Sequence, residues 1–169
     1  MRYKKIFHGF DVLFFSIIVL TSIGFLNNAN ALFHDQGSQR DGVIDDTKKI
    51  IQSLFDRVKI ASNNYQSEIS FLNQSINNNE TIINTTQGYI DNLKEIILFA
   101  KKTTVQQDYK PVLNNYIDSI ENEIESYVHY KKYIITGNLT ENKISMDLLS
   151  KAFNYETQAI NLYKQLELQ

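Results

Sequence analysis

Four apolar stripes at helical spacing constrain the fold of this chain more than any other feature of its sequence. The stripes recur at steps of three and four residues and are separated by short polar interruptions. With 6 glycines and 1 proline in 169 residues, the chain has few of the turn residues that a sheet protein needs. The sequence therefore predicts an all-α protein.

The stripes also predict how the helices are arranged. The first stripe is a heptad seam in which Ser62 is the one polar member. Connections of two to five residues force neighbouring helices to run in opposite directions. We therefore expect an up-down-up-down antiparallel four-helix bundle with coiled-coil-like packing over residues 43–169. The predicted helices span residues 43–77, 80–104, 109–136 and 141–167.

Local signals predict where the third and fourth helices begin and end. Pro111 falls in the first turn of the third helix, where its missing N–H has no partner to lose. Asp108 and Thr140 are the expected N-caps of the third and fourth helices, because short oxygen-bearing side chains accept from free N–H groups. Gly137 suits the left-handed residue that ends the third helix.

The N-terminus has the pattern of an export signal. Three basic residues stand within positions 2–5, and an apolar run of 15 residues follows from Val12 to Leu26. At roughly 1.5 Å per residue this run reaches about 22 Å, short of the ~30 Å that a spanning helix must cross. Ala29 and Ala31 supply the small residues that signal peptidase accepts. We expect residues 1–31 to be a signal peptide, with an uncleaved membrane anchor as the alternative, and residues 32–42 to be a polar leader.

Composition excludes several classes of function. The chain has no cysteine, so it has no disulfide, no thiolate nucleophile and no cysteine-type metal site. Without residues 1–31, the 17 Lys and Arg fall to 14 and the 19 Asp and Glu to 18, so the net charge moves from −2 to −4. Such a scattered acidic balance attracts neither nucleic acid nor an anionic membrane. We expect contact with a membrane only through the N-terminal segment.

Histidines and carboxylates do not form a metal-binding or catalytic pattern. Di-iron bundles use Glu-x-x-His motifs, but Ser126 stands three residues before His129, and the other histidine after residue 31 is His34 in the leader. Glu125 and His129 are four residues apart and can share a hydrogen bond on a helix surface, but two ligands do not make a metal site. We expect no catalytic residues, no cofactor and no metal, and therefore no enzyme.

Glu156 fits a simple bundle least well. It stands in the fourth stripe between Phe153 and Ile160, where a buried charge is costly unless it is paired. Either its carboxylate reaches water at the edge of the stripe, or it is buried beside a lysine, a tyrosine hydroxyl or a cationic ligand. Tyr127, His129 and Tyr130 form an aromatic and polar group that either lines a ligand pocket or belongs to the core and surface of the bundle.

Four Asn-x-Ser/Thr sequons are candidate glycosylation sites. In an up-down-up-down bundle they cluster at the end opposite the chain termini, so glycans would cover that end. The four asparagines are Asn73, Asn79, Asn84 and Asn138.

These features predict an exported, non-enzymatic bundle that binds a protein partner or a small ligand at the cell surface or in the extracytoplasmic space. The alternatives are a self-associating coiled-coil component of the surface, which would be a homo-oligomer, and a bundle that carries a ligand or a metal. Solution mass separates the first two classes, and metal analysis tests the third.

Overall fold

The computed structural model describes residues 42–72 and 79–168. The chain divides into two units, Met1–Arg40 and Asp41–Gln169, and every described residue belongs to the second. The predicted signal peptide and its cleavage site at Ala29 and Ala31, residues 32–41 of the predicted leader, and the sequon at Asn73 lie outside the described residues.

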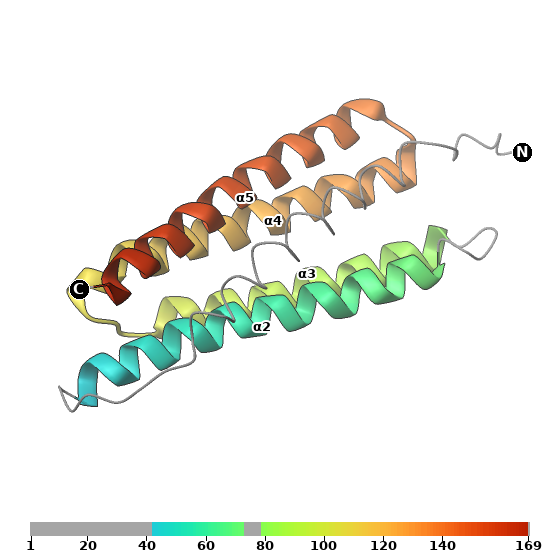
Figure 1. Ribbon diagram of the computed structural model, residues 1–169. Coiled ribbons are helices and arrows are strands. Elements are labelled where there is room, and N and C mark those ends of the chain that lie inside the picture. The colour runs from blue at the N-terminus through green and yellow to red at the C-terminus, as the bar shows by residue number, and fades with distance from the viewer. Residues whose placement is uncertain (1–41, 73–78, 169) are drawn as a thin grey trace, which may run out of the picture. The chain divides into compact units, whose positions relative to one another are not determined.

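The described part of the second unit is built of helices, which confirms the all-α prediction and the helical bundle (Figure 1). No strand occurs in residues 42–72 or 79–168. Apart from the end of α2, whose predicted last residues lie outside the described chain, each observed helix end is within two residues of its predicted position. The elements are α2 (Gly42–Leu72), α3 (Asn79–Lys102), the 3-10 turn η1 (Gln107–Tyr109), α4 (Lys110–Thr136) and α5 (Leu139–Glu167).

The start of α4 differs from the predicted cap. Asp108 lies inside η1 and does not cap α4, so that prediction was wrong. The N-cap is Tyr109, which has helical backbone angles and makes no side-chain capping hydrogen bond. Because η1 leads directly into α4, the chain is already helical before the predicted cap position. Pro111 lies in the first turn, as predicted.

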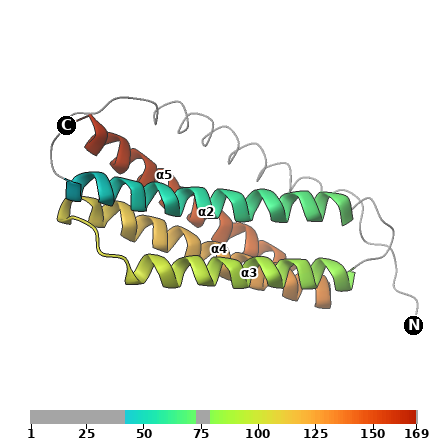
Figure 2. The ribbon, with the colours of Figure 1, turned by 90° about the horizontal axis from the view of Figure 1, so that it is seen from below.

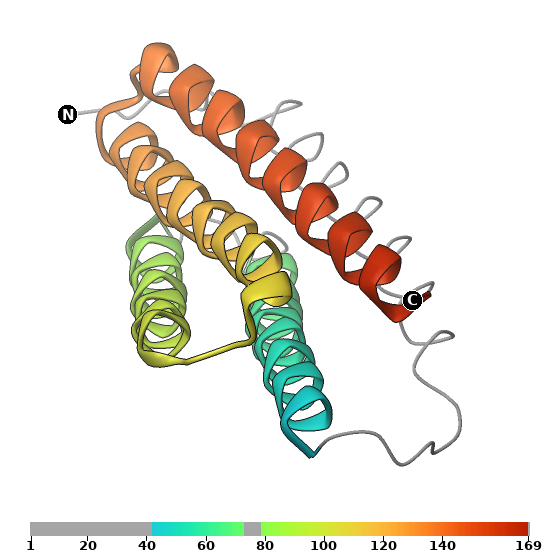
Figure 3. The same cartoon turned by 90° about the vertical axis from the view of Figure 1, so that its left-hand side faces the viewer.

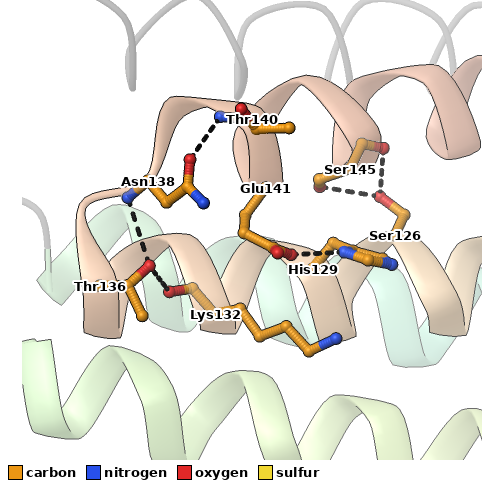
Figure 4. Close-up of polar contacts among 8 residues, drawn as sticks. All are labelled: Ser126, His129, Lys132, Thr136, Asn138, Thr140, Glu141 and Ser145. Atoms are coloured by element: carbon orange, nitrogen blue, oxygen red, sulfur yellow. Dashed lines mark hydrogen bonds and ion pairs between the residues drawn. The ribbon is translucent and has the colours of Figure 1, made fainter.

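The link between α4 and α5 is short because Gly137 and Asn138 end one helix and start the next (Figure 4). Gly137 adopts φ 69°, as predicted, and its N–H donates to the Tyr133 carbonyl at 2.7 Å. Asn138 is the N-cap of α5, and its side-chain oxygen accepts from the Thr140 N–H at 3.0 Å. The predicted cap at Thr140 was therefore wrong, because the helix begins two residues earlier than predicted and Asn138 supplies the acceptor.

Helices α4 and α5 approach each other most closely, because small side chains face one another along their contact. The Ser126 hydroxyl donates to the Ser145 carbonyl at 2.8 Å, and the Ser119 hydroxyl donates to the Ala152 carbonyl at 2.9 Å. Hydrogen bonds of this length from a side-chain hydroxyl to a carbonyl of the other helix require the two helix backbones to lie next to each other. Figure 3 shows α4 and α5 lying side by side, and Figure 2 shows α2 and α3 running alongside each other.

The core is apolar with an unusual share of tyrosine. The backbone of α5 comes close to that of α2 at fewer points than to that of α4. Large side chains therefore fill the space between α2 and α5. Phe55 on α2, for example, lies 5.8 Å from the Tyr163 ring on α5. No helix within the described ranges is both long enough and apolar enough to cross a membrane. The largest fully buried side chains are Tyr127, Ile51, Leu54, Ile69, Ile90, Leu93, Ile120 and Val112.

Candidate functional site

Each of the four helices contributes one residue to a polar cluster, which we define as Ser62, Tyr89, Glu123 and Glu156. The Tyr89 hydroxyl donates to Glu123 Oε1 at 2.6 Å, and Ser62 Oγ lies 2.7 Å from the same hydroxyl. Since the Tyr89 proton points to the carboxylate, Ser62 donates to the Tyr89 oxygen. Glu156 on α5 lies close enough to Glu123 for the charge of Glu123 to raise its pKa.

Three tyrosine rings pack together beside this cluster. Tyr65 and Tyr89 are stacked with ring centroids 4.5 Å apart, and the edge of Tyr127 lies 5.1 Å from each of them. The Tyr65 hydroxyl is 3.0 Å from Thr86 Oγ1, which donates to the Ile82 carbonyl at 2.7 Å. These contacts hold the rings in place and fix the position of the Tyr89 hydroxyl.

Tyr116 flanks the cluster near both carboxylates. Its ring packs edge-on against Phe55 at 4.5 Å. Burial, and then the charges of Glu156 and Glu123, raise the pKa of Tyr116 well above its usual value. Tyr116 therefore stays neutral, and its hydroxyl lies within electrostatic reach of both glutamates.

Both glutamates of the cluster are held in an environment that disfavours their charge. Burial raises the pKa of Glu123 from 4.5 to about 7, against the opposing effect of the hydrogen bond from Tyr89. Burial and then the charge of Glu123 raise the pKa of Glu156 from 4.5 to about 7. Within the described chain neither carboxylate forms an ion pair with a lysine or arginine. Two half-buried carboxylates of neighbouring helices therefore stand without a lysine or arginine counter-ion in the described chain.

Two tyrosine hydroxyls near the cluster have no partner within the described chain. Tyr116 is 3% exposed and Tyr127 is 2% exposed, and neither hydroxyl makes a hydrogen bond to a described residue. In the described residues, every side-chain nitrogen or oxygen that is sealed from solvent has a hydrogen-bond partner. Each of these two hydroxyls therefore keeps a small area in reach of solvent, which can serve as its hydrogen-bond partner.

The candidate site residues predicted from the sequence lie in two different parts of the bundle. Glu156 belongs to the polar cluster, and Tyr127 packs beside it. Glu156 is half-buried, and no described lysine or tyrosine forms a hydrogen bond or ion pair with it; the charge of Glu123 acts on it and raises its pKa. Tyr130 is buried and its ring lies 6.5 Å from that of Tyr133, so it belongs to the core towards the end of α4.

His129 does not join the polar cluster. Its Nδ1 lies 2.6 Å from Glu141 Oε2 in the first turn of α5 (Figure 4). The predicted surface pair with Glu125 was wrong, because Glu125 is exposed and the short link after Gly137 brings Glu141 opposite the imidazole. The contact joins the two helices near their connection.

The sequon asparagines that the structure describes lie in different local settings. Asn79 is the first residue of α3, and Asn138 is the exposed N-cap of α5. Asn84 is exposed inside α3, but the hydroxyl of its sequon residue Thr86 is buried and bonded to the Ile82 carbonyl. In the folded chain the sequon at Asn84 is therefore less accessible to a glycosylating enzyme than the sequon at Asn138.

Sequence reasoning missed Glu123, Tyr116 and Tyr89 as parts of one site, although a signal for Glu123 was present. A strict alternation of four and three residues runs from Tyr116 through Ile120 and Glu123 to Tyr127. The adjacent Ile124 is apolar and lies at almost the same place on the helix. The apolar stripe can therefore be drawn through Ile124, and Glu123 is then overlooked. Tyr89 stands among the apolar residues of its helix, and nothing in the pattern of one helix shows which partner its hydroxyl has.

Within residues 42–72 and 79–168, no group of three or more histidine, cysteine, aspartate or glutamate residues is arranged to hold a metal ion. Comparisons with protein families, with curated proteins and with solved structures found no match to this chain. The class that the fold defines is thus an all-α helical bundle, and a fold of this kind does not by itself determine a function.

Proposed function

We propose that this chain is an exported, non-enzymatic binding protein of the cell surface or extracytoplasmic space, and that its polar cluster holds a ligand. The observation that carries this proposal is the pair Glu123 and Glu156, which lack a counter-ion in the described chain. Partly buried carboxylates without a counter-ion weaken a fold, and apolar residues in their place are often neutral or stabilising. A ligand that interacts with the pair accounts for this cost.

The arrangement of the cluster fits binding better than catalysis. Its groups come from four different helices and are held by packed tyrosine rings, as ligand sites in helical bundles are. Ser62 donates to Tyr89 and is not beside a base that would activate it. No orienting group completes an acid–base pair in the described chain, so the cluster supplies a charged, rigid surface and not a nucleophile.

We also infer that the helices form the up-down-up-down antiparallel bundle predicted from the sequence. Its support is the order of the contacts, in which residue numbers rise on one helix as they fall on the next. The pairs are Ser62 with Tyr89 and Tyr65 with Thr86 for α2 and α3, and Ser119 with Ala152 and Ser126 with Ser145 for α4 and α5.

Export is supported by residues 1–31, with their basic start, apolar run of 15 residues and small residues at Ala29 and Ala31. An uncleaved segment would tether the bundle to the membrane and leave it facing outside. The sequons at the described positions Asn79, Asn84 and Asn138 would then be open to glycosylation in a host that performs it.

Native mass spectrometry of the full chain recovered from its producing cells tests export and binding together. We expect a mature protein that begins at Leu32 and carries a bound species that is absent from a Glu123→Gln/Glu156→Gln variant. An intact Met1 on protein found in the cytosol would exclude export. A bound species retained by the double variant, or none in either protein, would exclude the cluster as the binding site.

Self-association is a second candidate function, favoured by large apolar side chains at the α4–α5 connection. Ile135 is 63% exposed and Leu139 is 70% exposed. Light scattering over a range of concentrations distinguishes the candidates. A monomer at every concentration would rule out the coiled-coil surface component.

A further inference from the structure

The connection between α4 and α5 brings together a sequon and two exposed apolar side chains. Asn138 lies in this connection, Ile135 stands three residues before it, and Leu139 follows it directly. Resting on the proposed export, we propose that Asn138 carries an N-linked glycan whose first sugars cover Ile135 and Leu139. The glycan keeps this end of the bundle from pairing with a second copy of the chain.

The first step of the argument is the exposure of the sequon in the folded chain. Asn138, Leu139 and Thr140 are all exposed. Neither the Asn138 Nδ2 atom, which receives the sugar, nor the Thr140 hydroxyl, which completes the sequon, forms a hydrogen bond to a described residue. Both groups of the motif are therefore free at the surface.

The other two described sequons are less open. The sequon at Asn84 ends in Thr86, which is fully buried. The sequon at Asn79 ends in Thr81, which is half-buried. Of the three sequons within the described residues, the one at Asn138 is therefore the one whose residues are all exposed.

The second step is that a glycan on Asn138 leaves the helix cap intact. The cap uses Oδ1, which accepts from the Thr140 N–H at 3.0 Å (Figure 4). In glycosyl transfer the other amide atom, Nδ2, forms a bond to the anomeric carbon of a lipid-linked sugar pyrophosphate. The bond from that carbon to the pyrophosphate breaks, and Nδ2 loses one proton to the transferase. The amide oxygen is unchanged, so α5 keeps the acceptor at its start.

The third step comes from the two apolar side chains and does not depend on the sequon. Ile135 and Leu139 each expose most of their surface to water. Chain length places the Cα atoms of both within about 11 Å of the Asn138 Cα atom. The C–H faces of pyranose rings pack against aliphatic side chains while the ring hydroxyls stay in water, so the first sugars of a glycan suit these neighbours.

A glycan fits this patch better than a permanent protein partner does. A stable protein–protein interface buries about 800 Å² on each partner. Two aliphatic side chains supply a small part of that area, and the exposed residues beside them, Lys132, Thr136 and Thr140, are polar. A glycan needs no such area, because its covalent bond holds it at the patch. The uncovered patch supports weak pairing of two copies.

Peptide mass spectrometry of the full chain recovered from its producing cells tests the modification. An amidase that releases N-glycans turns each linked asparagine into aspartate, and heavy-oxygen water marks the sites where it has acted. We expect the mark at Asn138. An exported chain in which Asn138 is unmarked would overturn the proposal and leave export and ligand binding standing. An intact Met1 on cytosolic protein would exclude export, and this proposal with it.

Two variants made in the same cells test what the glycan does. Asn138→Asp keeps an acceptor for the cap but cannot be glycosylated, and Thr140→Ala removes the sequon but leaves Asn138 in place. Asn84→Gln is the matched control. In light scattering over a wide range of concentrations, we expect the wild type and Asn84→Gln to stay monomeric. Both sequon variants should approach about twice the monomer mass at the highest concentration, as a two-fold dimer does.

A second change in the Thr140→Ala variant identifies the surface that pairs. Adding Ile135→Ser and Leu139→Ser should restore the monomer, and circular dichroism confirms that each variant is folded. Equal masses for the wild type and both sequon variants at every concentration would overturn the covering role of the glycan. Pairing that persists after both serine substitutions would overturn it as well, since other residues would then form the contact.

Discussion

Replacing Glu156 with glutamine should stabilise the folded protein above neutral pH and leave its stability nearly unchanged in acid. Burial and the charge of Glu123 raise the pKa of Glu156 from 4.5 to about 7. The folded state therefore binds this proton more tightly than the unfolded chain does. The resulting stabilisation is fully present below about pH 4.5 and is lost as the pH rises through about 7. Glutamine has the shape of the protonated acid and cannot ionise.

The size of the effect follows from the difference between the two pKa values. At about 1.36 kcal/mol per pKa unit, the change from 4.5 to about 7 corresponds to roughly 3 kcal/mol. Because the side chain is half-buried, screening by solvent reduces this to roughly 2 kcal/mol. For a domain of this size, that free energy raises Tm by roughly 8 °C.

Thermal unfolding followed by circular dichroism, at about pH 5 and about pH 8, measures this difference. The comparison is between the wild type, Glu156→Gln and the exposed control Glu125→Gln. We expect a gain in Tm for Glu156→Gln at the higher pH, a much smaller gain at the lower pH, and little change for the control at either. A gain of equal size at both pH values, or a loss at the higher pH, would show that Glu156 carries no destabilising charge in the folded state.

Three further predictions test other parts of the structure. Glu123→Gln should lower the pKa of Glu156 but leave it above its usual value, because burial is the larger cause of the rise; carboxyl NMR titration measures the change, and an unchanged pKa would mean that the two carboxylates do not interact. Ser126→Val should reduce the free energy of unfolding by roughly 1–3 kcal/mol in urea titrations, because α4 and α5 touch there, whereas Val at the exposed Ser150 should change it by less than about 0.5 kcal/mol. Asn138→Ala should cost about 1 kcal/mol in the same assay through loss of the cap on Thr140, and no loss would contradict the capping geometry.

Periodicity was sufficient to predict the helices because their apolar residues are buried by one another. Thr86 shows the strength of this signal, since a polar residue in the second stripe is 0% exposed and satisfies its hydroxyl on its own helix and on Tyr65. The same reasoning identified Ser62 and Glu156 as residues out of place in apolar stripes. Both belong to the polar cluster, so exceptions to a strict pattern located half of its members.

Contacts between helices account for what the sequence did not predict. His129 was assigned to Glu125 because the two share a helix face, but its partner is Glu141 across a two-residue link. Spacing along one helix describes neighbours on that helix and says nothing of a side chain brought in by the next. The effect of Glu123 on Glu156 was missed for the same reason, since the two glutamates stand on different helices.

The contact of α4 and α5 sets where the two glutamates stand along the helices. Glu123 lies between Ser119 and Ser126 on α4, and Glu156 follows Ala152 on α5 by one turn. The serine hydroxyls bond to backbone carbonyls of α5, so they fix the register of the two helices. Within that register the charge of Glu123 still acts on Glu156, and no described lysine or arginine pairs with either carboxylate. A proton or a cation is therefore the remaining way to reduce their repulsion.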